Sequence, residues 1–126
     1  MKGGYMNKSL TDEWGTPIGL YVGMCKEFDI MPELDVCATP TNSKCEKFYD
    51  KNIDGLTQEW SCDFFMNPPF SKAKFWIQKA FEEHRKYNVN GMAVLAARTD
   101  TKAWHNYILN QANCEVMFVQ GRVKYL

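Results

Sequence analysis

The chain has 126 residues, 45% of them hydrophobic and 14% aromatic, which is enough to bury one core but not two. Its 15 basic and 15 acidic side chains cancel, so a nucleic-acid partner would have to be held by a local patch rather than by the overall charge. This balance neither supports nor excludes binding to DNA.

The five cysteines are an odd number without a CxxC pair, which fits neither a secreted disulfide framework nor closely paired zinc ligands. We therefore expect reduced thiols and no metal site. No apolar run is long enough to span a membrane, and the first ten residues lack the apolar stretch of a signal peptide. We expect a cytoplasmic protein in which residues 1–10 are flexible and residues 11–126 form a single domain.

In the first half of the chain, Thr16 and Pro17 resemble a helix N-cap followed by proline at the first helical position, which predicts a helix over residues 17–27. Short strands are predicted at residues 34–37 and 47–49, followed by a loop at 50–55. Residues 62–66 form an apolar run broken only by Asp63, which is typical of a strand covered on both faces.

The second half continues the alternation. Ser71 is the expected N-cap of an amphipathic helix. That helix has an apolar face of Ala73, Trp76, Ile77, Ala80, Phe81 and His84 and a solvated face of Lys72, Lys74, Lys79, Glu83 and Lys86. A strand at 92–97, a helix capped by Thr99 or Asp100, and a strand at 115–119 follow. This order predicts an α/β fold whose mostly parallel sheet carries helices on both faces and binds ligands at the carboxyl ends of its strands.

The stretch Asn67-Pro68-Pro69-Phe70 directly follows the predicted strand at 62–66. Proline donates no backbone hydrogen bond and stiffens the chain, so the Asn67 amide and the carbonyls beside it are held in a fixed geometry. An amide and a carbonyl can both accept from one amino group, and the Phe70 ring can stack on a heterocycle. Adenine fits such a site; a plain turn after a strand is the alternative.

Several segments, in this order along the chain, resemble phage-type N-6-adenine DNA methyltransferases: "DEWGTP", "LDVCATPTNSKC", "DGL" before a tryptophan, "FFMNPPFSK", "ARTDTKAWH" and "QGRVKYL". The resemblance covers roughly residues 12–126. NPPF alone also occurs in protein and RNA methyltransferases, so the ordered set is the more specific signal. The resemblance implies a class I, Rossmann-like methyltransferase fold, S-adenosylmethionine as donor, the adenine amino group of DNA as acceptor, and a phage or prophage protein in a bacterial host.

The resemblance also implies functional residues. The catalytic ones are Asn67, Pro68, Pro69 and Phe70. Those that bind S-adenosylmethionine are Trp14, Thr16, Pro17, Asp35, Cys37, Ala38, Asp54 and Asn67. Those that bind DNA are Lys72, Lys74, Arg98, Thr99, Lys102 and Arg122, with Lys124 as a further candidate. The segment 35–39 departs from the glycine-rich form of the donor-binding motif, which leaves the individual donor contacts open.

Simpler structural roles compete with these assignments. Asp35 would then be a loop or cap carboxylate, and Asp54 part of a turn. Lys72 and Lys74 would be solvated charges on a helix whether or not DNA touches them. Neither His84 nor His105 is given a catalytic role.

Three functional classes stay open: an active DNA methyltransferase, a non-catalytic relative that binds DNA, donor or a protein, and an enzyme that methylates RNA or protein through the same motif. Sheets of this class close with an antiparallel hairpin, and this chain stops at Leu126, so we expect the last strand to be lacking. Either a homodimer that pairs residues 122–126 covers the open edge, or the enzyme is weakened.

Overall fold

The computed structural model describes residues 15–121 and 123. The predicted flexible segment at residues 1–10 lies outside this range. Its elements in chain order are α2 (Ile18–Phe28), β1 (Leu34–Asp35), β2 (Lys47–Phe48), η1 (Gly55–Thr57), β3 (Phe64–Met66), η2 (Phe70–Lys72), α3 (Ala73–Tyr87), β4 (Gly91–Ala93), α4 (Lys102–Trp104) and the π-helical turn η3 (His105–Leu109).

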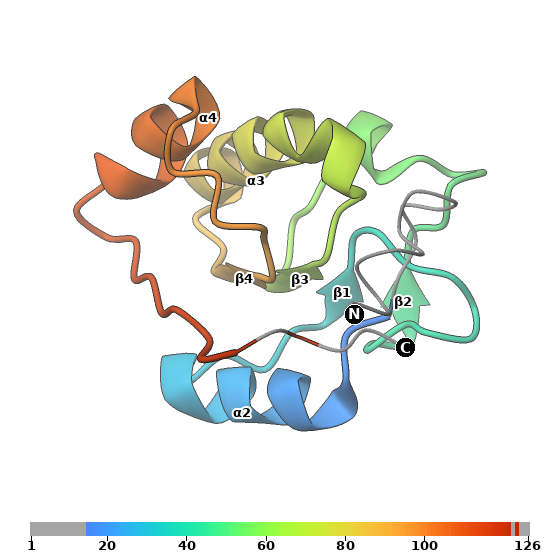
Figure 1. The fold of residues 1–126 in the computed structure, drawn as a ribbon. Coiled ribbons are helices and arrows are strands. Elements are labelled where there is room, and N and C mark those ends of the chain that lie inside the picture. Colours follow the sequence, from blue (N-terminus) through green and yellow to red (C-terminus); the bar gives the residue numbers. More distant parts are fainter. Residues whose placement is uncertain (1–14, 122, 124–126) are drawn as a thin grey trace.

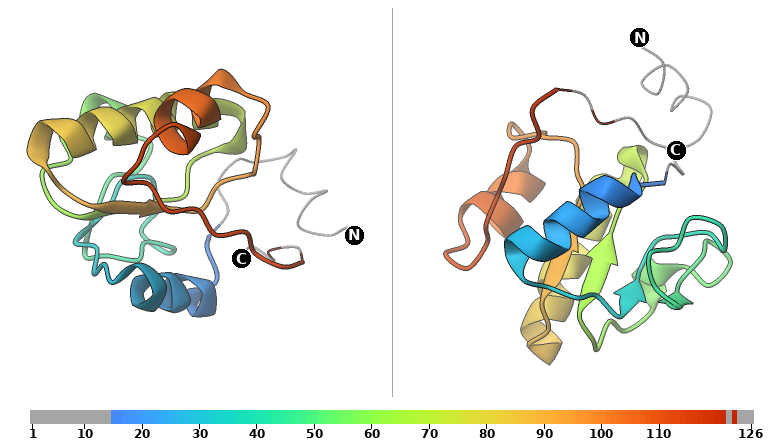
Figure 2. Two further views of the ribbon diagram at one scale, coloured as in Figure 1. Left: turned by 90° about the vertical axis from the view of Figure 1, so that its left-hand side faces the viewer. Right: turned by 90° about the horizontal axis from the view of Figure 1, so that it is seen from below.

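The strands form one parallel sheet in the order β2-β1-β3-β4. Helix α2 covers one face of this sheet, and α3 and α4 cover the other (Figure 1; Figure 2). The predicted α/β sheet with helices on both faces is therefore confirmed, as is the first helix. The two strands of the first half are also present, each shorter than predicted.

The side chains of β3 alternate between two hydrophobic clusters, one on each face of the sheet. Phe64 and Met66 pack with Trp60 and Trp76 on the α3 side, whereas Phe65 points to the α2 side. There the Tyr21 ring of α2 meets the Phe65 ring edge-on, with centroids 5.0 Å apart. Successive side chains of a strand point to opposite faces, so this one strand supplies apolar side chains to both layers.

Two predicted N-caps are wrong. The N-cap of α2 is Pro17 rather than Thr16, and no side chain bonds to that helix start. Ser71 lies inside the 3₁₀ turn η2, and the residue before α3 is Lys72, again without a side-chain cap. A cap needs a non-helical backbone with the side chain turned toward the first free N–H groups, and residue type alone does not establish that geometry.

The helix after β4 begins later than predicted, so the prediction that Thr99 or Asp100 caps it is wrong. Thr101 is the cap: its Oγ1 accepts from the backbone N–H of Trp104 at 3.4 Å and donates to the carbonyl of Arg98 at 2.7 Å. Threonine at 99 and at 101 offers the same hydroxyl, but Thr101 has the extended backbone that a cap requires.

The predicted strand boundaries shift in the second half. β3 keeps only residues 64–66 of the predicted 62–66, and β4 spans 91–93 rather than 92–97. The prediction of a strand at 115–119 is wrong, because this segment pairs with no strand and its residues Met117, Phe118 and Val119 are exposed. An apolar β-prone sequence becomes a strand only where a sheet edge accepts it.

Glu83 was predicted on the solvated face of α3, and that prediction is also wrong. Its side chain is buried, where Oε1 accepts from the backbone N–H of Trp60 at 2.6 Å and Oε2 lies 3.4 Å from Lys79 Nζ. The buried N–H of Trp60 needs an acceptor, and Glu83 supplies one from the neighbouring helix.

All five cysteines are free thiols. Within the described ranges, no helix combines the length and apolar character needed to cross a membrane.

The close packing around Gly55 leaves no room for a larger side chain, so a substitution there should destabilise the fold. A Cβ there would collide with the carbonyl oxygen of Val36 and come within 3.1 Å of two ring atoms of Trp76. Gly55→Ala should therefore lower the free energy of unfolding by about 1–3 kcal/mol, measured by urea denaturation. Gly19→Ala is the matched control: a Cβ there meets nothing within 4 Å, and alanine should stabilise α2 slightly. Equal stability of the two variants would contradict the close approach of the 55 loop to β1.

Candidate active site

The site begins where β3 leaves the sheet. The carbonyl of Phe65 accepts from the backbone N–H of Val36 at 3.1 Å, and the carbonyl of Met66 accepts from that of Val94 at 3.0 Å. β3 is thus held on both edges up to the residue before Asn67. Asn67, half-buried, is the first residue beyond this pairing.

The two prolines carry the chain from the strand into η2. Pro68 is buried, and Pro69 has φ −57° and ψ 136°, the extended conformation that its ring favours. The carbonyl of Pro69 accepts from the N–H of Lys72 at 3.2 Å and closes the turn that begins at Phe70. The ring of Phe70 is half-buried and lines a cavity described below. The predicted catalytic residues thus form one short, stiff connection at the carboxyl end of β3.

Asp35 ends the adjacent strand and lies opposite Phe65 in register. Its carboxylate is buried: Oδ2 accepts from the N–H of Lys44 at 2.9 Å, and Oδ1 from that of Cys37 at 3.4 Å. Burial raises the pKa of Asp35 to about 6, although the two backbone hydrogen bonds and the Lys44 charge act in the opposite direction. Both oxygens therefore support the loop of residues 36–44.

This loop carries two of the predicted donor-binding residues. Cys37 is half-buried and Ala38 is buried, and the N–H of Ala38 donates to the carbonyl of Tyr49 at 3.0 Å. Thr39 and Asn42 close the turn beyond them, with the N–H of Thr39 donating to Asn42 Oδ1 at 2.8 Å. The backbone after β1 is thus fixed to β2 and to Asp35.

Asp54 is brought to the same end of the sheet by the glycine that follows it, since Gly55 abuts the Val36 carbonyl. Asp54 is exposed with φ 62°, and its carboxylate accepts from the N–H of Leu56 at 3.1 Å as the cap of η1. The indole N–H of Trp60 donates to the Gly55 carbonyl at 2.9 Å and anchors this turn to the core. Asp54 was predicted either to bind the donor or to be part of a turn, and the structure contains this turn.

Thr16 and Pro17 lie at the start of α2. The carboxyl end of α2 leads into β1, so its amino end lies near the carboxyl ends of the strands (Figure 2). Thr16 is 1% exposed, and its hydroxyl has no hydrogen-bond partner among the described residues. A buried hydroxyl without a partner is costly, so this atom is a candidate ligand contact that residue type alone did not reveal.

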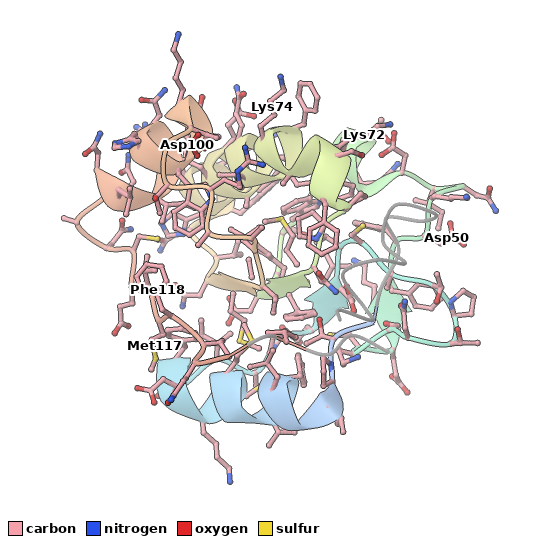
Figure 3. All side chains as sticks on the ribbon, in the orientation of Figure 1. Asp50, Lys72, Lys74, Asp100, Met117 and Phe118 are labelled. Atoms are coloured by element: carbon pink, nitrogen blue, oxygen red, sulfur yellow. The ribbon has the colours of Figure 1, made fainter. Side chains whose placement is uncertain are left out.

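The predicted DNA-binding residues come from three elements on the α3 side of the sheet. Lys72 and Lys74 are exposed at the start of α3, and Figure 3 places them on the same side of the molecule as Asp100. Arg98 is exposed with its Nε 3.8 Å from an Asp100 oxygen, and Lys102 is exposed at the start of α4. The structure therefore brings these cations to one side.

Thr99 is exposed in the loop after β4, and its carbonyl bonds to Nε2 of His105 at 2.8 Å. The second histidine, His84, bonds through Nδ1 to the Val89 carbonyl at 2.6 Å and through Nε2 to the Asn113 side chain at 3.0 Å. Both histidines thus hold neighbouring segments in place. Trp14, Arg122 and Lys124 lie outside the described residues.

A cavity of about 940 Å³ lies beside the NPPF stretch and was not predicted from the sequence. It runs along β4 between α2 and the α3–α4 pair, and Met66 and Phe70 connect it with the end of β3. Residues 113–119 also line it, and Figure 3 shows Met117 and Phe118 on this segment, above α2. Asn67, Asp35 and Thr16 do not line it. Periodicity indicates which side chains are apolar, but not whether the packed layers leave space between them.

Three comparisons with known proteins bear on this arrangement. Residues 3–126 match the model of the family "DNA N-6-adenine-methyltransferase (Dam)". The chain is 27% identical over 125 residues to the DNA N-6-adenine-methyltransferase of Escherichia phage T1, an alignment that covers 95% of this chain and 50% of the relative. The chain thus spans about half the length of this curated relative.

No solved structure matches the chain. The family match covers nearly its whole length and includes the NPPF stretch at the end of β3. The chain therefore belongs to the family of DNA N-6-adenine-methyltransferases (Dam).

Proposed function

We propose that this chain is the catalytic unit of a DNA adenine-N6 methyltransferase, which transfers a methyl group from S-adenosylmethionine to the amino group of adenine. The observation that carries the proposal is Asn67-Pro68-Pro69-Phe70 at the end of a strand paired on both edges, in a member of the Dam family. The parallel sheet with helices on both faces is compatible with a class I, Rossmann-like methyltransferase fold, which is part of the proposal.

Asn67 and the backbone beside it would hold the adenine amino group. The side-chain oxygen of Asn67 and a carbonyl of the proline pair both accept from that group, so its lone pair stays directed at the incoming methyl carbon. Phe70 stacks on the adenine ring. The stiff proline connection keeps these groups in position before the substrate arrives, so little ordering remains to be done at the reaction.

The residues at the carboxyl ends of the strands fit the methyl donor. The unpaired hydroxyl of Thr16 supports this fit, because a bound ligand would supply its missing partner. Pro17, Asp54 and the backbone at Cys37 and Ala38 complete the proposed donor site. S-adenosylmethionine, when bound, supplies an electrophilic methyl group on a sulfonium centre.

Asp35 has a positioning role in this proposal. Its two oxygens accept from the backbone of the 36–44 loop, so the carboxylate fixes the loop that the donor would touch. We therefore propose that Asp35 supports this loop, whereas the sequence predicted that Asp35 contacts the donor directly.

DNA would approach from the side that carries Lys72, Lys74, Arg98, Thr99 and Lys102, whose cations contact phosphates. An adenine inside a duplex is shielded by stacking, so it would have to leave the stack at a cost of a few kcal/mol, roughly. The predicted homodimer through residues 122–126 stays a prediction, since residues 122 and 124–126 lie outside the described range.

The first test removes the proposed amine acceptor. Asn67→Ala should lower methyl transfer to unmethylated DNA by about 100-fold or more, because the amino group loses a fixed acceptor, while calorimetry with S-adenosylhomocysteine should change little. Asn106→Ala, at an exposed position on η3, is the matched control and should keep the wild-type rate. Transfer of labelled methyl groups is measured on DNA, RNA and protein in parallel.

A wild-type rate in the Asn67 variant would remove NPPF from the mechanism. Transfer to RNA or protein alone would assign a different substrate, and an inert wild-type chain would make it a non-catalytic relative.

The second test uses the unpaired hydroxyl. Thr16→Val should raise the free energy of unfolding by about 1 kcal/mol, because a methyl group replaces a buried hydroxyl without a partner. The same change should weaken S-adenosylhomocysteine binding about fivefold, as measured by calorimetry. Thr101→Val is the control: it loses a helix cap, so it should destabilise the fold by about 1 kcal/mol without altering the affinity. Unchanged affinity in the Thr16 variant would exclude that hydroxyl from the donor site.

The third test follows the pKa of Asp35, raised from 3.8 to about 6 in the fold. Because the folded state holds this proton more tightly, the stabilising contribution of Asp35 is complete below pH 3.8 and is lost as the pH rises through about 6. Wild type should therefore lose about 2–3 kcal/mol of stability relative to Asp35→Asn between about pH 4 and pH 7. Urea unfolding of both proteins across this range measures the difference. Parallel curves would show that Asp35 titrates as it does in the unfolded chain.

A further inference from the structure

The outer face of α3 carries one exposed aromatic side chain. Phe75 is 52% exposed, and it is the one large exposed apolar side chain in Ala73–Tyr87. The other exposed side chains of this helix are Lys74, Gln78, Glu82, Arg85 and Lys86. An apolar ring on a charged helix face is not explained by the core, since the buried residues of α3 lie on its other side.

The surroundings of Phe75 are cationic. The ammonium group of Lys74 lies 5.1 Å from the ring centroid, a cation–π contact that places a positive charge beside the ring. Lys72 lies one turn earlier, and neither lysine has a carboxylate partner in the described part of the chain. Residues 64–81 contain no aspartate or glutamate. The patch of Lys72, Lys74 and Phe75 thus joins an exposed ring to two unneutralised charges.

The patch follows the NPPF stretch directly. Phe75 comes five residues after Phe70, with only the short turn η2 and the start of α3 between them. At a rise of about 1.5–2 Å per helical residue, five residues separate the two backbone positions by about 7.5–10 Å, or roughly two to three stacked bases at about 3.4 Å each. Nucleotides next to an adenine held at Phe70 are therefore within reach of Phe75.

We propose that Phe75 stacks on a DNA base left exposed when the target adenine leaves the helix, while Lys72 and Lys74 neutralise the flanking phosphates. The inference rests on the proposed function for its substrate, DNA. An aromatic ring interleaved with lysines is the combination that binds unstacked nucleic acid, because every base offers a π-face and every nucleotide a phosphate. If this patch bound a protein instead of DNA, that protein would need acidic side chains opposite the lysines around Phe75. The test below distinguishes this alternative from binding to DNA.

The test is a binding measurement that needs neither donor nor methyl transfer. Fluorescence anisotropy is recorded with a labelled single strand of about 30 nucleotides, whose bases are exposed, and with the fully paired duplex, whose bases are not. Phe75→Ala should weaken binding to the single strand about tenfold and to the duplex by no more than about twofold. Phe75→Tyr keeps the ring and should stay within about twofold of wild type on both probes.

Two further variants separate stacking from charge and from general surface effects. Lys74→Ala should weaken both probes alike and lower the slope of log affinity against log salt by about 1, which Phe75→Ala should leave unchanged. Leu109→Ala, at an exposed apolar position on η3, should bind both probes as wild type does.

The inference is overturned if Phe75→Ala binds the single strand as tightly as wild type, if it loses affinity for both probes equally, or if the wild-type chain binds neither probe. Because no methyl transfer is measured, an inactive protein that shows the Phe75 dependence would refute the proposed reaction and still support the stacking role. An active enzyme without this dependence would do the reverse.

Discussion

The backbone carbonyls of Phe65 and Met66 accept hydrogen bonds from different neighbours. That of Phe65 accepts from the chain after β1, and that of Met66 accepts from the chain after β4. β3 is thereby an inner strand of the sheet, and its last paired residue fixes where the chain leaves. Asn67 and the two prolines then follow without freedom to slide, because a shift of one residue would exchange the faces on which Phe64, Phe65 and Met66 are buried. The geometry of the candidate site therefore depends on the register of a three-residue strand.

A second set of contacts ties the loop before β3 to the helix after it. Trp60 donates its backbone N–H to the buried carboxylate of Glu83 and its indole N–H to the carbonyl of Gly55, and it stacks on Trp76 with ring centroids 6.1 Å apart. Removing one member of such a buried network leaves another polar group without a partner, which costs more than the bond itself contributes. The turn that presents Asp54 is thus held by the core as well as by the cap that Asp54 itself provides.

Thr16 in the candidate donor site and Phe75 on the surface each depart from the usual environment of their residue type. At Thr16, a buried hydroxyl without a partner lowers stability but leaves a contact open for a ligand. At Phe75, an exposed ring among lysines forgoes burial in the same way. Thr16 directly precedes the start of α2 and Phe75 lies in the first turn of α3, and the indole nitrogen of Trp76 is a further buried polar atom without a partner among the described residues.

Sequence patterns correctly predicted the alternation of helices and strands, the apolar face of α3 with Trp76 and Ile77, and the placement of Asn67 at the end of a buried strand. These features follow from periods of 3.6 and 2 and from the chemistry of proline, which act within a few residues. The burial of Glu83 and the pairing of the Asp35 carboxylate could not be predicted in this way, because folding brings in their partners from 23 and 9 residues away in the chain. Residues 115–119 also show that tertiary partners cannot be predicted from local sequence. Their composition favours a strand, but a strand exists only where a neighbouring edge supplies its hydrogen bonds.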